Sequence, residues 1–349
     1  MNHFIRACPL IAHSLVFRAL TYQSGATDFD PGPHNALRPV SPQGGHIEWL
    51  FWLIFWICLV VYVLMVMGFS TAAAKSEAGT DEPPPIIEDE EGDRRASWFV
   101  GTATGVTVLS LFVVLVLSVI AEKRVEGTPK ENAVTIQVTG HQWWWEITYP
   151  NSQADLTINT ANEIHVPIRT PIVILTKSAD VIHSFWVPSI TGKRDLIPGI
   201  SSAFSFEVKT PGVYHGQCAE FCGLQHAHMG FAVVADTPED FAAWQQRQLS
   251  DAAEPANPQQ ALGKTVFLTH ACLMCHTIQG TQAGSRMGPD LTHVASRRMI
   301  AAETLPNIPG ALGGWIIDPQ QIKPGNHMAP NGLRGDELEA LISYLQSLK

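Results

Sequence analysis

Two stretches of this 349-residue sequence almost lack charged residues. Residues 47–69 contain one, Glu48 at the edge of the run, and residues 98–120 contain no Asp, Glu, Lys or Arg. Each run exceeds the ~20 apolar residues that cross the core of a bilayer. Two buried core helices are a weaker alternative, because such helices normally keep a polar stripe. The sequence therefore predicts a two-helix transmembrane hairpin over residues 47–120, with spans at about 47–69 and 98–120 in contact with the lipid bilayer.

Basic residues are missing from residues 77–93, where eight acids account for −8 of the formal net charge of −10. A run of one sign that also holds Pro83, Pro84 and Pro85 is typical of a solvated connector. The net charge therefore indicates no particular partner for the rest of the chain, and we expect no nucleic-acid partner. Lys and Arg flank both ends of the hairpin, so their distribution does not orient it.

A good signal peptide is lacking too, because His13 and Arg18 interrupt the short apolar stretch at residues 8–20. Residues 1–46 are predicted to form an N-terminal arm of unassigned role. Beyond the hairpin, we divide the chain into a domain at 121–236, a helix and linker at 237–260, and a second domain at 261–349.

Apolar residues alternate with polar ones after the second span. The alternating positions are Val134, Ile136 and Val138, then Trp143, Trp145, Ile147 and Tyr149, then Ile164, Val166 and Ile168, and finally Phe204, Phe206 and Val208. Short runs with period two, broken by Asn, Pro and Gly, are typical of strands. They predict an antiparallel β-sandwich or barrel over about residues 131–236.

Four potential metal ligands lie close together in CAEFCGLQHAHMGF, residues 218–231: Cys218, Cys222, His226 and Met229. Zinc has little use for a thioether, whereas copper electron-transfer sites combine imidazole, thiolate and a weak axial Met. Two cysteines with three residues between them could each bridge two copper ions. Such a pair needs a second imidazole, which His183 supplies, and the Glu220 carbonyl could complete the second copper. A zinc site and a disulfide stay open as alternatives.

Thr237 and the PEDFAAWQQRQ that follows it predict a helix, and DAAEPANPQQ then reads as a flexible linker. A tether of this length would keep the last domain near the copper site. Even a weak, reversible contact between the domain and that site would then suffice for turnover.

The last domain contains CLMCH, residues 272–276, which is the C-x-x-C-H pattern of haem c attachment. The thiols of Cys272 and Cys275 would add to the haem vinyl groups, with His276 beneath the iron. The final fifteen residues predict a helix with one apolar face. That face carries Leu338, Leu341, Ile342, Leu345 and Leu348.

Three stretches carry a resemblance to a known family: HQWWW (141–145), DVIHSFWVP (180–188) and YHGQCAEFCGLQHAHMGF (214–231). Together they resemble the signature of subunit II of the haem–copper cytochrome c oxidases. The resemblance implies a cupredoxin-like Greek-key sandwich that holds a dinuclear copper centre. Its implied ligands are His183, Cys218, the Glu220 carbonyl, Cys222, His226 and Met229.

The same resemblance implies two further roles. Trp143 would be the aromatic residue through which electrons arrive, and the Glu220 carboxylate would reach a magnesium ion shared with subunit I. An aromatic run on a strand also occurs simply as core and rim, and that alternative stays open for the tryptophans.

The C-terminal domain resembles a small, all-α class I cytochrome c. GPDL (288–291) is similar to the loop whose proline carbonyl orients the proximal histidine. Met328 lies in KPGNHMAP, where that family carries its axial methionine. Met274 lies inside the attachment motif and Met287 immediately precedes the proximal loop, so neither easily reaches the opposite haem face. His327 is a competing axial ligand, and Trp315 resembles the tryptophan that binds a haem propionate.

A subunit II with a fused cytochrome c is similar to those of the caa-type oxidases. The resemblance implies electron transfer from haem c to the dinuclear copper and on to subunit I, where oxygen is reduced to water and protons are pumped. Implied partners are subunits I and III and an external donor, either cytochrome c or a cytochrome bc complex. The implied location is the cell (inner) membrane, with both metal domains on the periplasmic or extracellular side.

The chain departs from the family in two places. Ile200 stands where an arginine or glutamine is frequent, and the second span lacks a Glu-Trp-Thr-Pro opening, which leaves a proton-uptake role unsupported. Two rival functions stay open: the copper subunit of a nitric oxide reductase, and a membrane-anchored electron carrier. Copurification with a larger haem-bearing chain would separate the second from an oxidase, and an oxygen-consumption assay would separate the first.

Overall fold

The computed structural model describes residues 35–75, 90–126 and 132–349. Residues 1–34 of the predicted arm, 76–89 of the acidic connector and 127–131 lie outside the described residues.

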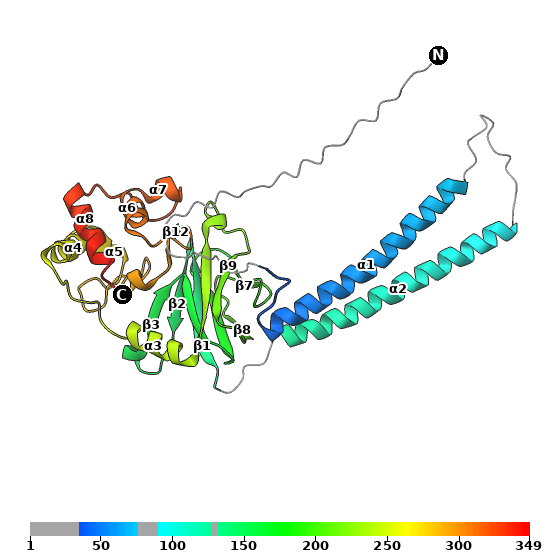
Figure 1. Cartoon of the computed structure of the whole chain (residues 1–349), viewed down its shortest axis with the longest axis horizontal. Helices are drawn as coiled ribbons and strands as arrows, with labels where there is room; N and C mark the ends of the chain where they lie inside the picture. The colour runs from blue at the N-terminus through cyan, green and yellow to red at the C-terminus, as the bar shows by residue number, and fades with distance from the viewer. Residues whose placement is uncertain (1–34, 76–89, 127–131) are drawn as a thin grey trace, which may run out of the picture. The chain divides into compact units, whose positions relative to one another are not determined.

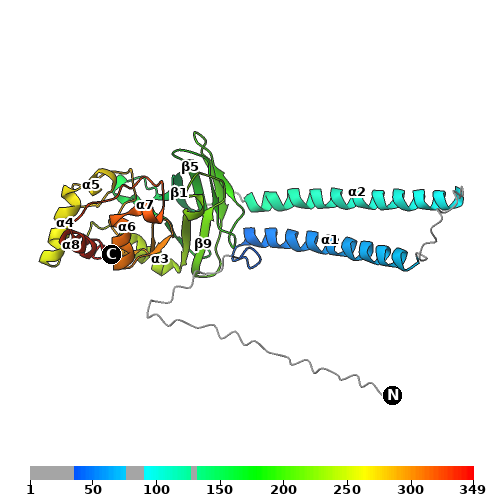
Figure 2. The same ribbon diagram turned by 90° about the horizontal axis from the view of Figure 1, so that it is seen from above.

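The hairpin consists of α1 (Pro42–Lys75) and α2 (Glu90–Glu126), which run side by side (Figures 1 and 2). Both predicted spans fall inside these helices. Their most apolar windows have mean hydropathies of 2.8 and 2.6 and are 0% buried, so the alternative of two buried core helices is wrong. Because such surfaces are stable only when lipid or another apolar surface covers them, the hairpin is suited to a membrane.

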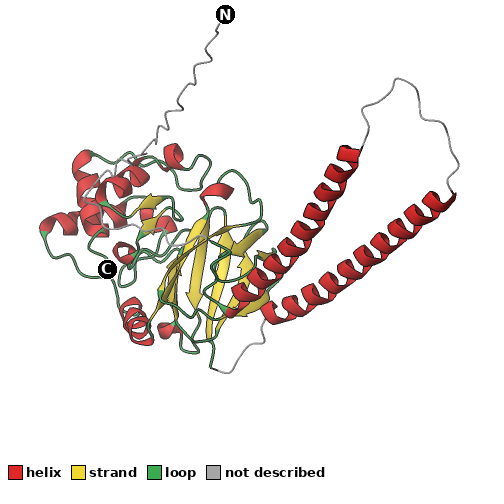
Figure 3. Ribbon diagram, turned by 45° about the vertical axis from the view of Figure 1, so that its right-hand side comes forward, coloured by secondary structure: helices red, strands yellow, loops and turns green. Residues whose placement is uncertain are grey.

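The β domain is a sandwich of two five-stranded sheets. The first has the order β3 (Ile158–Ala161), β2 (Trp144–Tyr149), β1 (Val134–His141), β5 (Ile172–Ser178) and β8 (Ser202–Phe206). The second has the order β4 (Glu163–Pro167), β10 (Gly230–Asp236), β9 (Gly212–Cys218), β6 (His183–Trp186) and β7 (Arg194–Leu196). Figure 3 shows the sandwich strands, in yellow, gathered in this one domain.

The alternation of apolar residues puts one face of each sheet into a shared core. Trp145, Ile147, Phe185 and Phe231 are fully buried there. Most strand pairs are antiparallel as predicted, but β1 pairs with β5 and β10 with β4 in parallel. Other strands lie between β1 and β5 along the chain, and others lie between β4 and β10. A parallel pair requires such a crossover connection between its two members. Local periodicity does not reveal it.

The predicted helix after Thr237 is confirmed as α3 (Pro238–Gln248). The Thr237 hydroxyl caps it by accepting from the Asp240 amide at 3.2 Å. Trp244 stacks on His165 with ring centroids 4.4 Å apart, which fixes the helix to the sandwich. The connection that follows is bonded to the last domain, because Ala252 donates to the Gln279 carbonyl.

The C-terminal domain is built from α4 (Pro258–Thr269), α5 (Cys272–Cys275), α6 (Pro309–Ile317), α7 (Pro319–Ile322) and α8 (Gly335–Leu345). A short hairpin joins β11 (Met299–Ile300) to β12 (Leu305–Pro306), and the 3-10 turn η3 (Val294–Ser296) precedes it. Two other 3-10 turns, η1 (Ala154–Leu156) and η2 (His226–His228), belong to the β domain. α4 and α8 cross closely at Gly263, where an added Cβ would lie 2.1 Å from the Ala340 carbonyl oxygen. Phe267 and Tyr344 are buried at this crossing, which gives the domain its own core.

Candidate copper and haem sites

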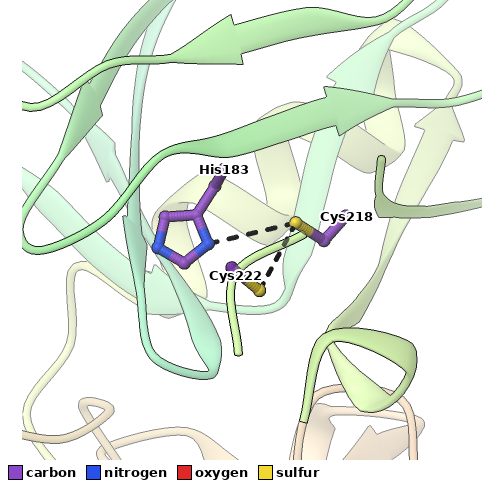
Figure 4. Close-up of side chains that lie close together, drawn as sticks. All are labelled: His183, Cys218 and Cys222. Carbon is purple, nitrogen blue, oxygen red and sulfur yellow. Dashed lines mark hydrogen bonds between the residues drawn. The ribbon is translucent and has the colours of Figure 1, made fainter. Parts of the chain in front are cut away.

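The sandwich brings the predicted copper ligands together at one end. Cys218 is the last residue of β9, Met229 immediately precedes β10, and His183 begins β6. Figure 4 shows His183, Cys218 and Cys222 pointing toward one another. The connection between β9 and β10 supplies the Glu220 carbonyl and His226. β6, β9 and the connection between β9 and β10 therefore position the six predicted copper donors.

The donor atoms form one cluster. Sγ of Cys218 lies 3.8 Å from Sγ of Cys222, 3.9 Å from Nδ1 of His183 and 3.2 Å from the Glu220 carbonyl oxygen. Sγ of Cys222 lies 3.6 Å from Nδ1 of His226 and 3.8 Å from Sδ of Met229. The ligand atoms of His183 and the two cysteines all fall within 4.8 Å of one another.

The geometry separates the open alternatives. A disulfide has an S–S distance of about 2.05 Å, so two thiols 3.8 Å apart are not bonded. A structural zinc site takes four ligands and has no need of a thioether. Two thiols, two imidazoles, a thioether and a carbonyl in one cluster fit copper better than zinc.

The contact between the two thiols shifts their pKa values in opposite directions. The contact with Cys222 lowers the pKa of Cys218 to about 3. The same contact, together with burial, raises the pKa of Cys222 well above its usual range. Binding of copper by both sulfurs must therefore release a proton from this pair.

Asp180 orients His183 and was not singled out from the sequence. Its carboxylate accepts a hydrogen bond from Nε2 of His183 at 2.8 Å, which leaves Nδ1 directed at Cys218. Burial acts to lower the pKa of His183, but the bonds with Asp180 and Cys218 outweigh it and raise that pKa. A carboxylate behind a histidine is a common way to fix a metal ligand, and its position three residues before His183 could have pointed to it.

The three tryptophans of HQWWW occupy different environments. Trp145 is fully buried and packs against His183 and Phe231, as a core residue. Trp144 is half-buried and stacks on His141. Trp143 lies in the turn before β2, and its Nε1 donates to the Cys222 carbonyl at 2.9 Å. The core-and-rim interpretation therefore suits Trp145 and Trp144. Trp143 instead contacts the connection between β9 and β10, residues 219–229, which we term the copper loop.

The Glu220 carbonyl oxygen lies in the cluster, 3.2 Å from Sγ of Cys218, and its role as a copper ligand stays a prediction. The magnesium role of its carboxylate stays a prediction.

The haem attachment motif forms α5, with His276 directly after it. Nδ1 of His276 donates to the Pro289 carbonyl at 2.8 Å, so Nε2 is the ring nitrogen left for iron. Burial lowers the pKa of His276, which keeps the imidazole neutral at pH 7. An added Cβ at Gly288 would lie 2.9 Å from Cε1 of the His276 ring, so GPDL needs glycine at that position. These contacts, with free thiols at Cys272 and Cys275, fit a covalently bound haem.

The proposed axial methionine lies on the connection between α7 and α8, residues 323–334, which we term the haem loop or Met328 loop. Polar contacts shape this loop. The Met328 amide donates to Asn326 Oδ1, and the Met328 carbonyl accepts from Gln320. Trp315 lies in α6 and packs, half-buried, on the domain core. His327, the competing axial ligand, has its ring 5.8 Å from the ring of Trp143, which favours Met328 as the ligand.

Comparison with known proteins decides the family. Residues 152–236 match the periplasmic domain of cytochrome c oxidase subunit II, and residues 260–349 match cytochrome c. Cytochrome c oxidase subunit 2 of Alkalihalophilus pseudofirmus is 31% identical over 319 residues, covering 90% of this chain and 91% of that protein. The chain belongs to the cytochrome c oxidase subunit II family. The subunit of Bacillus subtilis is 29% identical over 304 residues, or 83% of each chain.

Membership confirms several expectations for this subunit II. It is an electron-transfer component of a haem–copper oxidase, with a copper domain, a haem c domain and two membrane helices. As a subunit, it associates with other oxidase subunits.

The cytochrome c domain of this subunit II contacts the copper domain through polar groups. Arg286 donates to Glu146 at 2.9 Å, and Glu303 pairs with His215 at 3.0 Å. A bond with His141, and the Arg286 charge, lower the pKa of Glu146 despite its partial burial. The Gly230 amide donates to the Ala302 carbonyl at 3.2 Å. The two domains are thus joined by side-chain and backbone contacts as well as by the chain.

Proposed function

We propose that this chain accepts electrons from an external donor at its cytochrome c domain and delivers them through its copper domain to a haem-bearing subunit I. There oxygen would be reduced to water, with proton pumping. A covalent haem and a dinuclear copper centre supply the one-electron carriers when bound. The chain's own residues would hold these groups and place the two sites beside each other.

The observation that carries this proposal is an unbroken set of contacts between the two sites. His327, next to the proposed axial Met328, packs against Trp143. Trp143 is 8% exposed and donates to the carbonyl of Cys222, a proposed copper ligand. A contact between two rings and a hydrogen bond therefore connect the Met328 loop to the copper loop.

The proposal implies particular partners and a particular membrane topology for the chain. Haem attachment and the copper site belong outside the cytoplasm, so residues 121–349 would be periplasmic or extracellular. Subunits I and III would surround the hairpin in the cell membrane, and the donor would be a cytochrome c or a cytochrome bc complex. A magnesium ion at the Glu220 carboxylate would lie at the boundary with subunit I.

The test compares two adjacent tryptophans in the purified oxidase. Haem c is reduced by a light pulse, and its reoxidation is followed together with reduction of copper. Trp143→Ala should slow this transfer severely, because it removes the contact with both His327 and Cys222. Trp144→Ala is the matched control and should transfer at the normal rate. Equal rates in the two variants would contradict the proposed route.

A further inference from the structure

Lys323 is a buried lysine held between the two domains. It is 2% exposed, although lysine is almost never fully buried unless it is paired. Its Nζ donates to the Trp143 carbonyl at 3.0 Å and to the Ala301 carbonyl at 3.1 Å. The first acceptor belongs to the copper domain and the second to the cytochrome domain. Among the ion pairs of the described residues, none involves Lys323.

The residues after Lys323 also touch the copper domain. The Pro324 carbonyl accepts from Nε2 of Gln225 at 2.6 Å. Gly325 has a φ of +82°, and an added Cβ there would lie 2.7 Å from Cδ1 of Leu224. His327 packs on Trp143. Residues 323–327, which we term the docking segment, therefore lie against Trp143 and the copper loop, and Met328 follows directly.

We propose that Lys323 is a positioning residue that fixes the docking segment on Trp143 and so holds the haem loop in place for electron transfer to copper. This inference rests on the proposed function. Lys323 does not touch either metal site's ligands in the described contacts, so its effect is on the docking of the two domains.

The chemistry of the side chain supports this role. Burial lowers the pKa of Lys323 to about 7, and a buried amino group is costly in either protonation state unless its donors find acceptors. Two carbonyl groups accept from it here, and only the docked arrangement supplies the one from Trp143. An ammonium is compact and directs its three donors freely, so it can bridge two backbone carbonyls that do not lie in one plane. A lysine that served the cytochrome fold alone would not require an acceptor 180 residues away.

The test uses Lys323→Met in the intact oxidase, with Lys264→Met as the matched control. Lys264 bonds to Glu254 within the C-terminal part, so Lys264→Met removes a hydrogen-bonded lysine without touching the copper domain. The reporter is hydrogen exchange at the Gly230 amide, which is bonded across the domains to Ala302. Exchange measures how often the domains separate, even when they are docked most of the time.

Lys323→Met should accelerate exchange at Gly230 by about tenfold or more, because the buried hydrogen bond that joins the domains at Trp143 is lost. Lys264→Met should leave it unchanged. Haem c reoxidation by copper should slow in the same order, while the haem spectrum and the copper signal stay as in the unmodified protein. Lys323→Gln, which keeps a donor on a shorter chain, should fall between the two and provides a second variant should the first fold poorly.

Unchanged exchange at Gly230 in both Lys323 variants would overturn the proposal. Loss of the copper signal in these variants would also overturn it, because Lys323 would then support the copper site instead of docking. If haem c failed to reduce copper in the unmodified oxidase, the proposed function would be wrong, whereas exchange at Gly230 would still report on docking alone.

Discussion

Gly140 in β1 lies directly against the ring of His183. An added Cβ at this position would lie 2.7 Å from Cδ2 and 2.9 Å from Cγ of that ring. Carbon atoms in contact prefer separations of about 3.5–4.0 Å. Gly140→Ala therefore forces either the strand or the imidazole to move by close to an ångström.

The imidazole has little freedom to move. His183 is 0% exposed, Asp180 holds its Nε2 at 2.8 Å, and Trp145 packs on its edge. Overpacking of a core site of this kind costs about 1–3 kcal/mol. For a domain of this size, that corresponds to a fall in Tm of about 5–15 °C. Because the displaced group is a proposed copper ligand, we expect the copper signal to change as well.

The assay follows the copper absorption of the purified protein during heating, with the haem c absorption as an internal reference. Gly192→Ala is the control, since the nearest atom to an added Cβ there is Cδ1 of Ile47 at an ordinary 3.5 Å. Gly140→Ala should lower the Tm of the copper signal and alter its spectrum, and the control should do neither. A Gly140→Ala protein with unchanged Tm and spectrum would refute the claim that His183 is confined by this strand.

Three further changes test other parts of the structure. Cys218→Ser removes one proposed bridging sulfur, so the mixed-valence copper signal should disappear from the electron paramagnetic resonance spectrum while the haem c spectrum persists. Asp180→Asn keeps the shape but weakens the bond that orients His183, and it should lower copper affinity by about 10–100-fold in a chelator competition. Gly263→Ala puts a methyl group 2.1 Å from the Ala340 carbonyl oxygen, so it should destabilise the cytochrome domain by more than about 1 kcal/mol in denaturant unfolding followed by haem absorption.

Each of these has an outcome that contradicts it. One copper per chain, or zinc, in the unmodified protein would rule out the dinuclear assignment tested by Cys218→Ser. Normal copper retention in Asp180→Asn would show that the sandwich alone orients His183. Gly284→Ala, where an added Cβ meets nothing within 4 Å, is the control for Gly263→Ala, and equal stability of the two would refute the close helix crossing.

The sequence carried much of this architecture because the decisive patterns are local. Long uncharged runs, period-two alternation and the spacing of CLMCH each lie within a few turns or one strand. The proximity of the proposed copper donors was also predictable, since most of them fall within twelve residues and only His183 comes from elsewhere. The parallel pairing of β1 with β5 was missed, because it depends on the path of the chain between them.

Long-range contacts account for what the sequence could not show. The flexible linker predicted from the sequence implied only a weak, reversible contact between the two domains. Lys323 looks from the sequence like an ordinary surface lysine, and its burial becomes apparent only when Trp143 and Ala301 are brought to it. The same holds for His327, whose neighbour Met328 suggested an axial ligand before the ring of Trp143 was known to lie beside it.

The contacts between the domains differ in what they can contribute. Arg286, whose side chain is 61% exposed, pairs with Glu146 in a position where solvent and salt screen the attraction, so this pair is worth at most about 1 kcal/mol. Charges of that kind mainly guide approach and orientation. Lys323 is shielded from solvent, and a displacement of either domain would remove its acceptor at Trp143. The exposed pair therefore favours encounter of the domains, while the buried lysine selects the one arrangement in which the Met328 loop faces Trp143.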